Sequence, residues 1–125
     1  MLEIALAETE SGVFQKDIAE RQKISNKYLD NIIASLKTAG LIINKKGKKS
    51  GYILSRKASK INILDIYKAF EPGFNVVECI SGTYKCNLEN TCGVRNFWEG
   101  LNTTITEYFR SFTLEDLIKE HKKRL

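Results

Sequence analysis

The sequence predicts a mostly α-helical fold with one small β-hairpin and a long C-terminal helix. Apolar residues recur at helical spacing in several segments of the 125-residue chain. Two short apolar runs, at 41–43 and 52–54, flank a loop rich in Gly and Lys, which is typical of a hairpin. A bulky apolar stripe runs from Phe97 to Phe112. The length suits one compact domain with an appended arm.

The N-terminal half is predicted to hold helices joined by tight turns. Residues 1–7 look like the end of an apolar helix, and 13–21 reads as a short helix. Ser25 suits the position before a second helix, because its hydroxyl can accept a bond from an otherwise unpaired amide. Gly40 suits the position after that helix. Its apolar side follows i, i+3, i+4, i+7 spacing, with Leu29, Ile32, Ile33 and Leu36.

Two such helices match the helix-turn-helix, in which the N-terminal residues of the second helix lie nearest the bases of DNA. Here those residues are Ser25, Asn26, Lys27 and Tyr28, and all four can donate hydrogen bonds to phosphates or base edges. A plain helical hairpin would show the same pattern.

The hairpin that follows favours the DNA-binding interpretation. A hairpin placed directly after a recognition helix is the wing of a winged helix, and its tip here is basic. From Lys37 to Lys60 the chain carries eight Lys or Arg and no Asp or Glu, although the whole chain has a net charge of only +5. Such a concentrated basic segment is typical of polyanion binders, although a solvated charge run would look similar.

The C-terminal half is predicted to begin with a helix capped by Asn62 and stopped at Pro72. An irregular segment follows, then a long helix from about Val94 and a last helix capped by Thr113. We therefore divide the chain into a winged helix-turn-helix domain (1–71), a cysteine-containing loop (72–93), and a long dimerisation helix with a C-terminal helix (94–125).

The stripe on the long helix is large for a small domain to cover, so we expect a symmetric homodimer. The alternative is that the stripe packs on its own domain. The residues expected at the dimer interface are Phe97, Leu101, Ile105, Tyr108, Phe109 and Phe112.

Three cysteines, Cys79, Cys86 and Cys92, lie within fourteen residues, and the chain has no others. An odd number argues against a disulfide framework. Thiolates suit iron–sulfur clusters, which normally take four protein ligands. Metal-free thiol sensing, a zinc site and inert loop residues remain alternatives.

Other classes of protein fit the sequence less well. The sequence has no run of 18 apolar residues, which a membrane span would need, and no recognisable signal peptide, so we expect a cytoplasmic protein. An enzyme with a reactive cysteine is disfavoured, because His121 is the only histidine and no His and Asp or Asn arrangement accompanies the thiols.

Five segments together resemble a known family. They are KDIAE (16–20), SNKYL (25–29), LKTAGL (36–41), KGKKSGYIL (46–54) and ILDIYKAFE (63–71). The chain resembles the bacterial winged-helix repressors of the IscR, NsrR and CymR type. The family usually begins with a longer first helix and carries Gly-Gly where this chain has Ser50-Gly51.

The resemblance implies a homodimer, formed through the long helix, that binds double-stranded promoter DNA. It also implies an iron–sulfur cluster at the three cysteines, of the [2Fe-2S] rather than the [4Fe-4S] type. In some two-iron relatives a His three residues after the last cysteine is the fourth ligand, but Arg95 stands there. The residues expected at the DNA are Lys16, Ser25, Asn26, Lys27, Tyr28, Lys37, Lys46, Lys48, Lys49 and Tyr52.

The function expected is therefore that of a transcriptional repressor that senses redox conditions, nitric oxide or iron–sulfur status through its cluster. The alternative is a cofactor-free regulator controlled by a partner protein, a metabolite or thiol oxidation.

Overall fold

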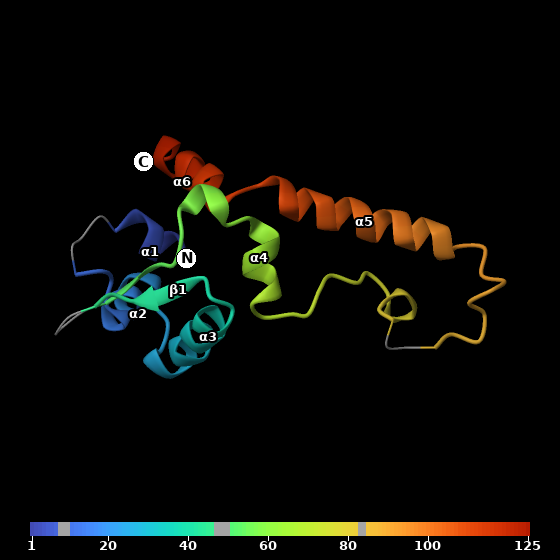
Figure 1. Cartoon of the computed structure of the whole chain (residues 1–125), viewed down its shortest axis with the longest axis horizontal. Coiled ribbons are helices and arrows are strands. Elements are labelled where there is room, and N and C mark those ends of the chain that lie inside the picture. Colours follow the sequence, from blue (N-terminus) through green and yellow to red (C-terminus); the bar gives the residue numbers. More distant parts are fainter. Residues whose placement is uncertain (8–10, 47–50, 83–84) are drawn as a thin grey trace.

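Six helices and a two-stranded hairpin form a body with one projecting arm in the part of the chain that the computed structural model describes, residues 1–7, 11–46, 51–82 and 85–125 (Figure 1). This arrangement confirms the predicted fold class. The body holds α1 to α4, the hairpin and α6, and the arm holds α5 and the segment before it. The elements are α1 (Leu2–Leu6), α2 (Gln15–Gln22), α3 (Asn26–Thr38), β1 (Ile42–Asn44), β2 (Tyr52–Leu54), η1 (Ala58–Lys60), α4 (Ile63–Lys68), η2 (Glu78–Ile80), α5 (Arg95–Ser111) and α6 (Leu114–Lys123).

Helix α3 begins and ends as the sequence predicts. The Ser25 hydroxyl oxygen accepts a hydrogen bond from the backbone N–H of Tyr28 at 3.1 Å, which caps the helix. Gly40 follows the helix with φ +74°, a conformation that favours glycine. The apolar face is buried in the body through Leu29, Ile33 and Leu36.

Helix α2 begins at Gln15, two residues later than the sequence predicted, because Val13 is extended and pairs with the hairpin. The backbone N–H of Tyr52 donates to the Val13 carbonyl at 2.7 Å, and the N–H of Val13 donates to the Tyr52 carbonyl at 3.0 Å. The first hairpin strand lies at Ile42–Asn44 rather than 41–43, and Ile43 pairs with Ile53. A third extended segment therefore pairs with the hairpin at the end of β2 nearest its loop.

Helices α4 and α6 both begin with a capping box, as Asn62 and Thr113 predict. Their starts are joined by backbone hydrogen bonds, from the N–H of Ile63 to the Phe112 carbonyl at 2.9 Å and from the N–H of Leu114 to the Ile61 carbonyl at 2.8 Å. Leu114 is almost fully buried in the body, and α6 packs against α1 and η1. The chain thus returns to the body after the arm.

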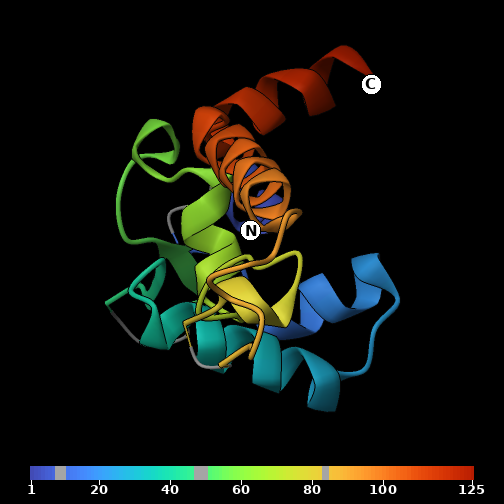
Figure 2. The same ribbon diagram turned by 90° about the vertical axis from the view of Figure 1, so that its right-hand side faces the viewer.

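Helix α5 projects from the body, and the segment that precedes it runs back along it (Figure 1). Figure 2 views α5 almost end-on, with this segment on one side of it. Where α5 leaves the body, the Phe109 ring packs against the rings of Tyr67 and Phe74, with centroids 5.5 and 5.8 Å away. In the described part of the chain, no helix is long and apolar enough to cross a membrane.

Candidate nucleic-acid interface and cysteine loop

The first turn of α3 is exposed, as a DNA-reading helix requires. Ser25, Asn26 and Lys27 are exposed, and the Tyr28 side chain is 60% exposed although it is large and aromatic. Two hydrogen bonds fix α2 against this turn, because the Gln15 amide nitrogen donates to the Asp30 carboxylate at 2.5 Å and to the Asn26 carbonyl at 3.4 Å.

The other end of α3 meets the hairpin. The Lys37 ammonium nitrogen lies 5.8 Å from the centroid of the Tyr52 ring, within the range of a cation–π contact. Lys37 lies in the last turn of α3, and Tyr52 begins β2. The structure therefore brings two predicted DNA-contacting residues together across the junction of helix and hairpin. Lys16 is exposed in the first turn of α2, beside Gln15.

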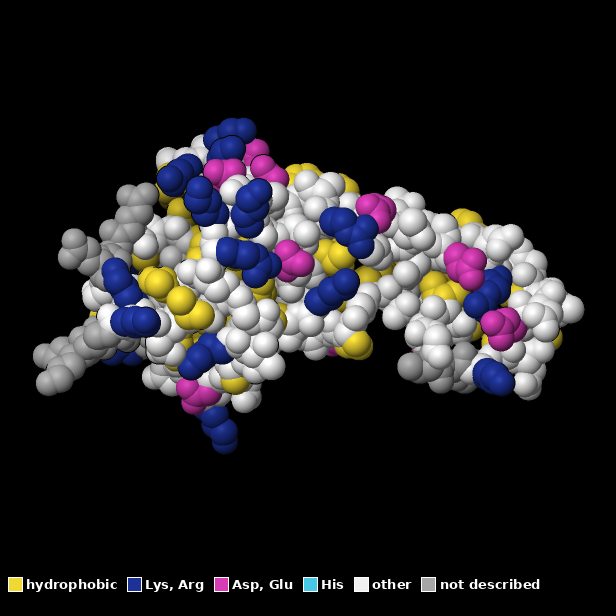
Figure 3. All heavy atoms as spheres, in the orientation of Figure 1, with side chains coloured by type: hydrophobic (Ala, Val, Ile, Leu, Met, Phe, Trp, Pro, Cys, Tyr) yellow, Lys and Arg dark blue, Asp and Glu magenta, His cyan; other side chains and the backbone are white. Residues whose placement is uncertain are grey.

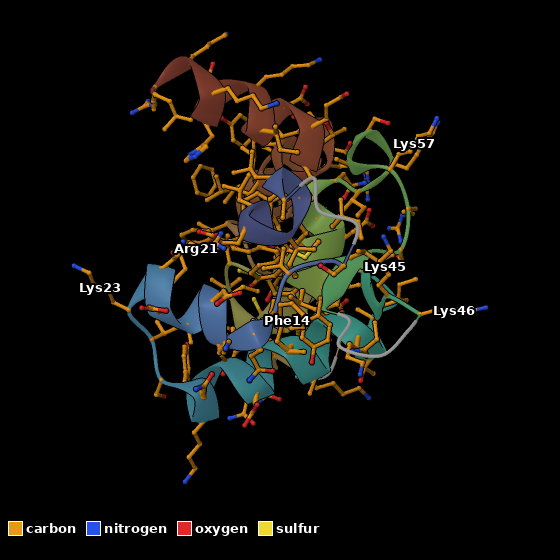
Figure 4. The ribbon with its side chains drawn as sticks, turned by 90° about the vertical axis from the view of Figure 1, so that its left-hand side faces the viewer. Phe14, Arg21, Lys23, Lys45, Lys46 and Lys57 are labelled. Carbon is orange, nitrogen blue, oxygen red and sulfur yellow. The ribbon has the colours of Figure 1, made fainter. Side chains whose placement is uncertain are left out.

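A basic edge, defined here as Lys45, Lys46 and Lys57, borders the body on the hairpin side. Figure 4 shows these three side chains along one edge of the face, with Arg21 and Lys23 at the opposite edge and Phe14 between. Lys45 and Lys57 were not among the predicted DNA-contacting residues, although the charge run from 37 to 60 contained both. Lys48 and Lys49 lie outside the described residues.

Basic side chains are distributed unevenly over the molecule. Figure 3 shows that Lys and Arg gather over the body and α6, whereas toward the far end of α5 they lie beside acidic side chains. Part of the α6 charge is neutralised locally, because Lys119 pairs with Glu115 at 3.8 Å and Lys123 pairs with Glu120 at 3.3 Å.

The apolar stripe of α5 is only partly covered by its own chain. Phe97 and Tyr108 are 65% and 64% exposed, and Leu101 and Phe112 are also exposed. These four residues are spaced by four, seven and four positions, which places them on one face of the helix. Ile105 is half-buried, and Phe109 is partly used within the chain, against α4 and the segment after it.

The three cysteines lie in the segment between α4 and α5. All three thiols are free and half-buried, with Cys79 in η2 and Cys92 just before α5. Among the described residues, no three His, Cys, Asp or Glu side chains come together as a group that could hold a metal. Side-chain hydrogen bonds of Asn102 and Arg95 are among the contacts that attach this segment to α5. The N–H of Val76 donates to the Asn102 side-chain oxygen at 2.9 Å, and the Arg95 guanidinium donates to the Cys79 carbonyl at 3.3 Å.

Comparison with known proteins identifies the family. The family model described as "Rrf2: Iron-dependent Transcriptional regulator" matches residues 1–120. The chain belongs to the Rrf2 family. It is a transcriptional regulator rather than an enzyme, which confirms the resemblance and the class of function expected from the sequence.

Individual Rrf2-type proteins agree along most of their length. A putative HTH-type regulator of Neisseria meningitidis serogroup A, NMA1593, is 36% identical over 96% of this chain and 80% of its own. The regulator IscR of Xenorhabdus nematophila is 32% identical over 98% of this chain and 74% of its own. The structure of IscR from T. potens has a TM-score of 0.77 at 32% identity, covering 98% and 80% of the two chains. The structure of CymR, the global cysteine regulator of B. subtilis, has a TM-score of 0.76 at 27% identity, covering 95% and 87%.

Proposed function

We propose that this Rrf2-family regulator binds promoter DNA as a homodimer and that an iron–sulfur cluster at Cys79, Cys86 and Cys92 controls its affinity. The observation that carries the DNA-binding part is the exposed first turn of α3, joined to the basic hairpin through Lys37 and Tyr52. The same proposal assigns DNA binding to residues 1–71, the cysteine-containing loop to 72–93 and dimerisation, with the C-terminal helix, to 94–125.

The α3 surface supplies contacts of two kinds. Ser25, Asn26, Lys27 and Tyr28 are exposed donors at the end of the helix that reads bases in helix-turn-helix proteins. The basic edge and Lys37 supply charge for phosphates, which positions the protein without reading sequence.

A homodimer would bury the exposed stripe of α5. A solvent-facing row of Phe97, Leu101, Tyr108 and Phe112 is unusual on a monomer, since a large exposed apolar patch typically marks an interaction site. A second copy of the same helix offers a matching row, and a two-fold axis would present two α3 helices to paired half-sites.

The cysteine segment has the donor chemistry that an iron–sulfur cluster requires. Three free thiols within fourteen residues supply soft ligands, and none is committed to a disulfide. When bound, the cluster supplies sensitivity to oxygen, nitric oxide or iron scarcity. The chain itself holds the segment against α5 through Val76 and Arg95, so a change in the segment acts next to the helix expected to form the dimer. Three thiols leave one cluster position for a fourth ligand, which a carboxylate of the partner subunit or a small molecule could supply.

The DNA surface is tested by binding of the full-length protein to duplexes that the wild type selects from genomic DNA. Lys27→Ala and Tyr28→Ala should each cost about 1–3 kcal/mol on the selected duplex and relax its sequence preference. Lys46→Ala with Lys57→Ala should weaken binding to all sequences and reduce the salt slope by about 2. Lys119→Ala, on α6, is the control. Unchanged binding in both sets would refute this assignment.

The cluster is tested by anaerobic purification, iron and sulfide analysis and a visible spectrum. A brown protein whose colour and iron are lost when the three cysteines are changed to Ser supports the proposal. The cofactor-free alternative is favoured by the finding that the described residues do not gather three metal ligands. A colourless, iron-free protein that still binds DNA would establish that alternative.

A further inference from the structure

Arg95, the first residue of α5, makes several separate contacts around the three cysteines. Its Nη1 donates to the Cys79 carbonyl at 3.3 Å, and its Nε lies 3.0 Å from Glu99 Oε1. Its Nη2 lies 3.6 Å from Glu89 Oε1, and its backbone N–H donates to the Cys92 carbonyl at 3.4 Å. Only 24% of its side chain is exposed. One residue therefore contacts the backbones of Cys79 and Cys92, the first and last of the three cysteines, and also pairs with Glu99 one turn along α5.

The guanidinium is suited to holding several oxygen atoms at once, and its chemistry excludes it as a metal ligand. Arg has five N–H donors in a fixed planar fork and no acceptor, so it can bridge several oxygens but cannot donate a lone pair to a metal. Lys would keep the charge but not the fork. Arg95 lies three residues after Cys92, so its backbone and side chain reach two different cysteine backbones at once.

We propose that Arg95 is a positioning residue whose guanidinium holds the Cys79 backbone against the start of α5 and thereby limits access to the Cys79 thiol. The Cys92 carbonyl accepts from the Arg95 backbone N–H, which a side-chain substitution leaves in place. In the described part of the chain, Cys86 has no hydrogen bond to Arg95. Its carbonyl accepts from the Glu89 N–H at 3.1 Å, and Glu89 contacts Arg95 only through the long, half-exposed ion pair. Any effect of this role on DNA binding rests on the proposed function, whereas the role itself is a property of the protein without a cluster.

The competing interpretation is that Arg95 makes ordinary surface ion pairs. Exposed pairs of this kind contribute little and are screened by salt. The two interpretations differ at the Cys79 carbonyl, because only the positioning role predicts that loss of the fork loosens Cys79 more than Cys86 or Cys92.

The experiment measures the alkylation rate of each cysteine by iodoacetamide, with peptide mass spectrometry, in the reduced, cluster-free full chain at fixed pH. In Arg95→Gln and Arg95→Lys we expect the rate at Cys79 to rise about threefold to tenfold, because local opening becomes easier. The rates at Cys86 and Cys92 should rise less, because the backbone hydrogen bonds at their carbonyls remain. The matched control is Arg110→Gln, since Arg110 also lies on α5 and pairs with Glu107 on the same helix.

An unchanged rate at Cys79 in both Arg95 variants would overturn the inference, as would an equal rise at all three cysteines in those variants or a rise of the same size at Cys79 in Arg110→Gln. Iron analysis of the reconstituted wild type separates this result from the cluster proposal. A colourless wild type with Arg95-dependent rates refutes the cluster and supports the positioning role. A coloured wild type with Arg95-independent rates supports the cluster and refutes the positioning role.

Discussion

Replacing Gly51 by Ala should destabilise the protein strongly, because the hairpin and the 11–13 segment approach each other at this residue. A Cβ on Gly51 would lie 2.3, 2.4 and 2.7 Å from the carbonyl oxygen, carbonyl carbon and nitrogen of Val13. All three are backbone atoms, so no side-chain rotation can relieve the contact, and the two segments must separate.

The cost can be worked from the bonds that this separation breaks. Three backbone hydrogen bonds depend on the approach: the two between Val13 and Tyr52, and one from the Gly51 N–H to the Ser11 carbonyl at 2.6 Å. At about 0.5–1.5 kcal/mol each, their loss lowers the free energy of unfolding by roughly 2–4 kcal/mol. Val13, only 4% exposed, would also lose packing.

The assay is urea unfolding of Gly51→Ala followed by circular dichroism, at one protein concentration because dimerisation would affect stability. Gly100→Ala is the matched control, since Gly100 lies inside α5 and its added Cβ meets nothing within 4 Å. That variant should gain up to about 1 kcal/mol, because Ala favours helix over Gly. A Gly51→Ala protein that unfolds at the wild-type urea midpoint would refute the reasoning.

Three further predictions concern a cap, a carboxylate and the α5 stripe. Ser25→Ala should lower unfolding free energy by about 1 kcal/mol in the same urea assay, whereas Ser25→Gly should lose only a few tenths. The backbone N–H and hydroxyl of Thr113 hold the pKa of Asp116 below its ordinary value, so its stabilisation is present at neutral pH and is lost as pH falls below about 4. The Tm difference between wild type and Asp116→Asn should therefore shrink on acidification, and a constant difference would contradict this cause. Phe97→Glu should shift sedimentation toward the monomer, whereas Phe70→Glu, also exposed but outside α5, should not; a wild type that is already monomeric would rule out the dimer.

Local signals in the sequence predicted the elements well where cap and periodicity agree. Ser25, Asn62 and Thr113 each cap the start of a helix, as predicted. A cap can be recognised from the sequence because its side-chain oxygen accepts from a backbone N–H only three residues further along the chain. The long helix was predicted from Val94 and begins at Arg95. Its apolar stripe is also a local signal, because it depends only on the spacing of residues within one helix.

Long-range pairing was not predictable in the same way. Nothing near Val13 shows that it joins Tyr52, so the start of α2 was placed two residues too early. The sequence predicted only a loop rich in Gly and Lys at this point, whereas the structure shows that the lack of a side chain on Gly51 admits the Val13 backbone. At the site, the sequence singled out the first turn of α3, but the closeness of Lys37 and Tyr52 depends on tertiary packing.

The paired starts of α4 and α6 determine how α5 can move. Hydrogen bonds from Ile63 to Phe112 and from Leu114 to Ile61 fasten one end of a helix that, at about 1.5 Å per residue, is about 25 Å long. If this helix rotated by about 5° about its fastened end, its Arg95 end would move by about 2 Å. The fastened end adjoins the core in which Leu114 and the apolar face of α3 are buried together, so the attachment point of the arm and the seat of α3 share one set of packed side chains.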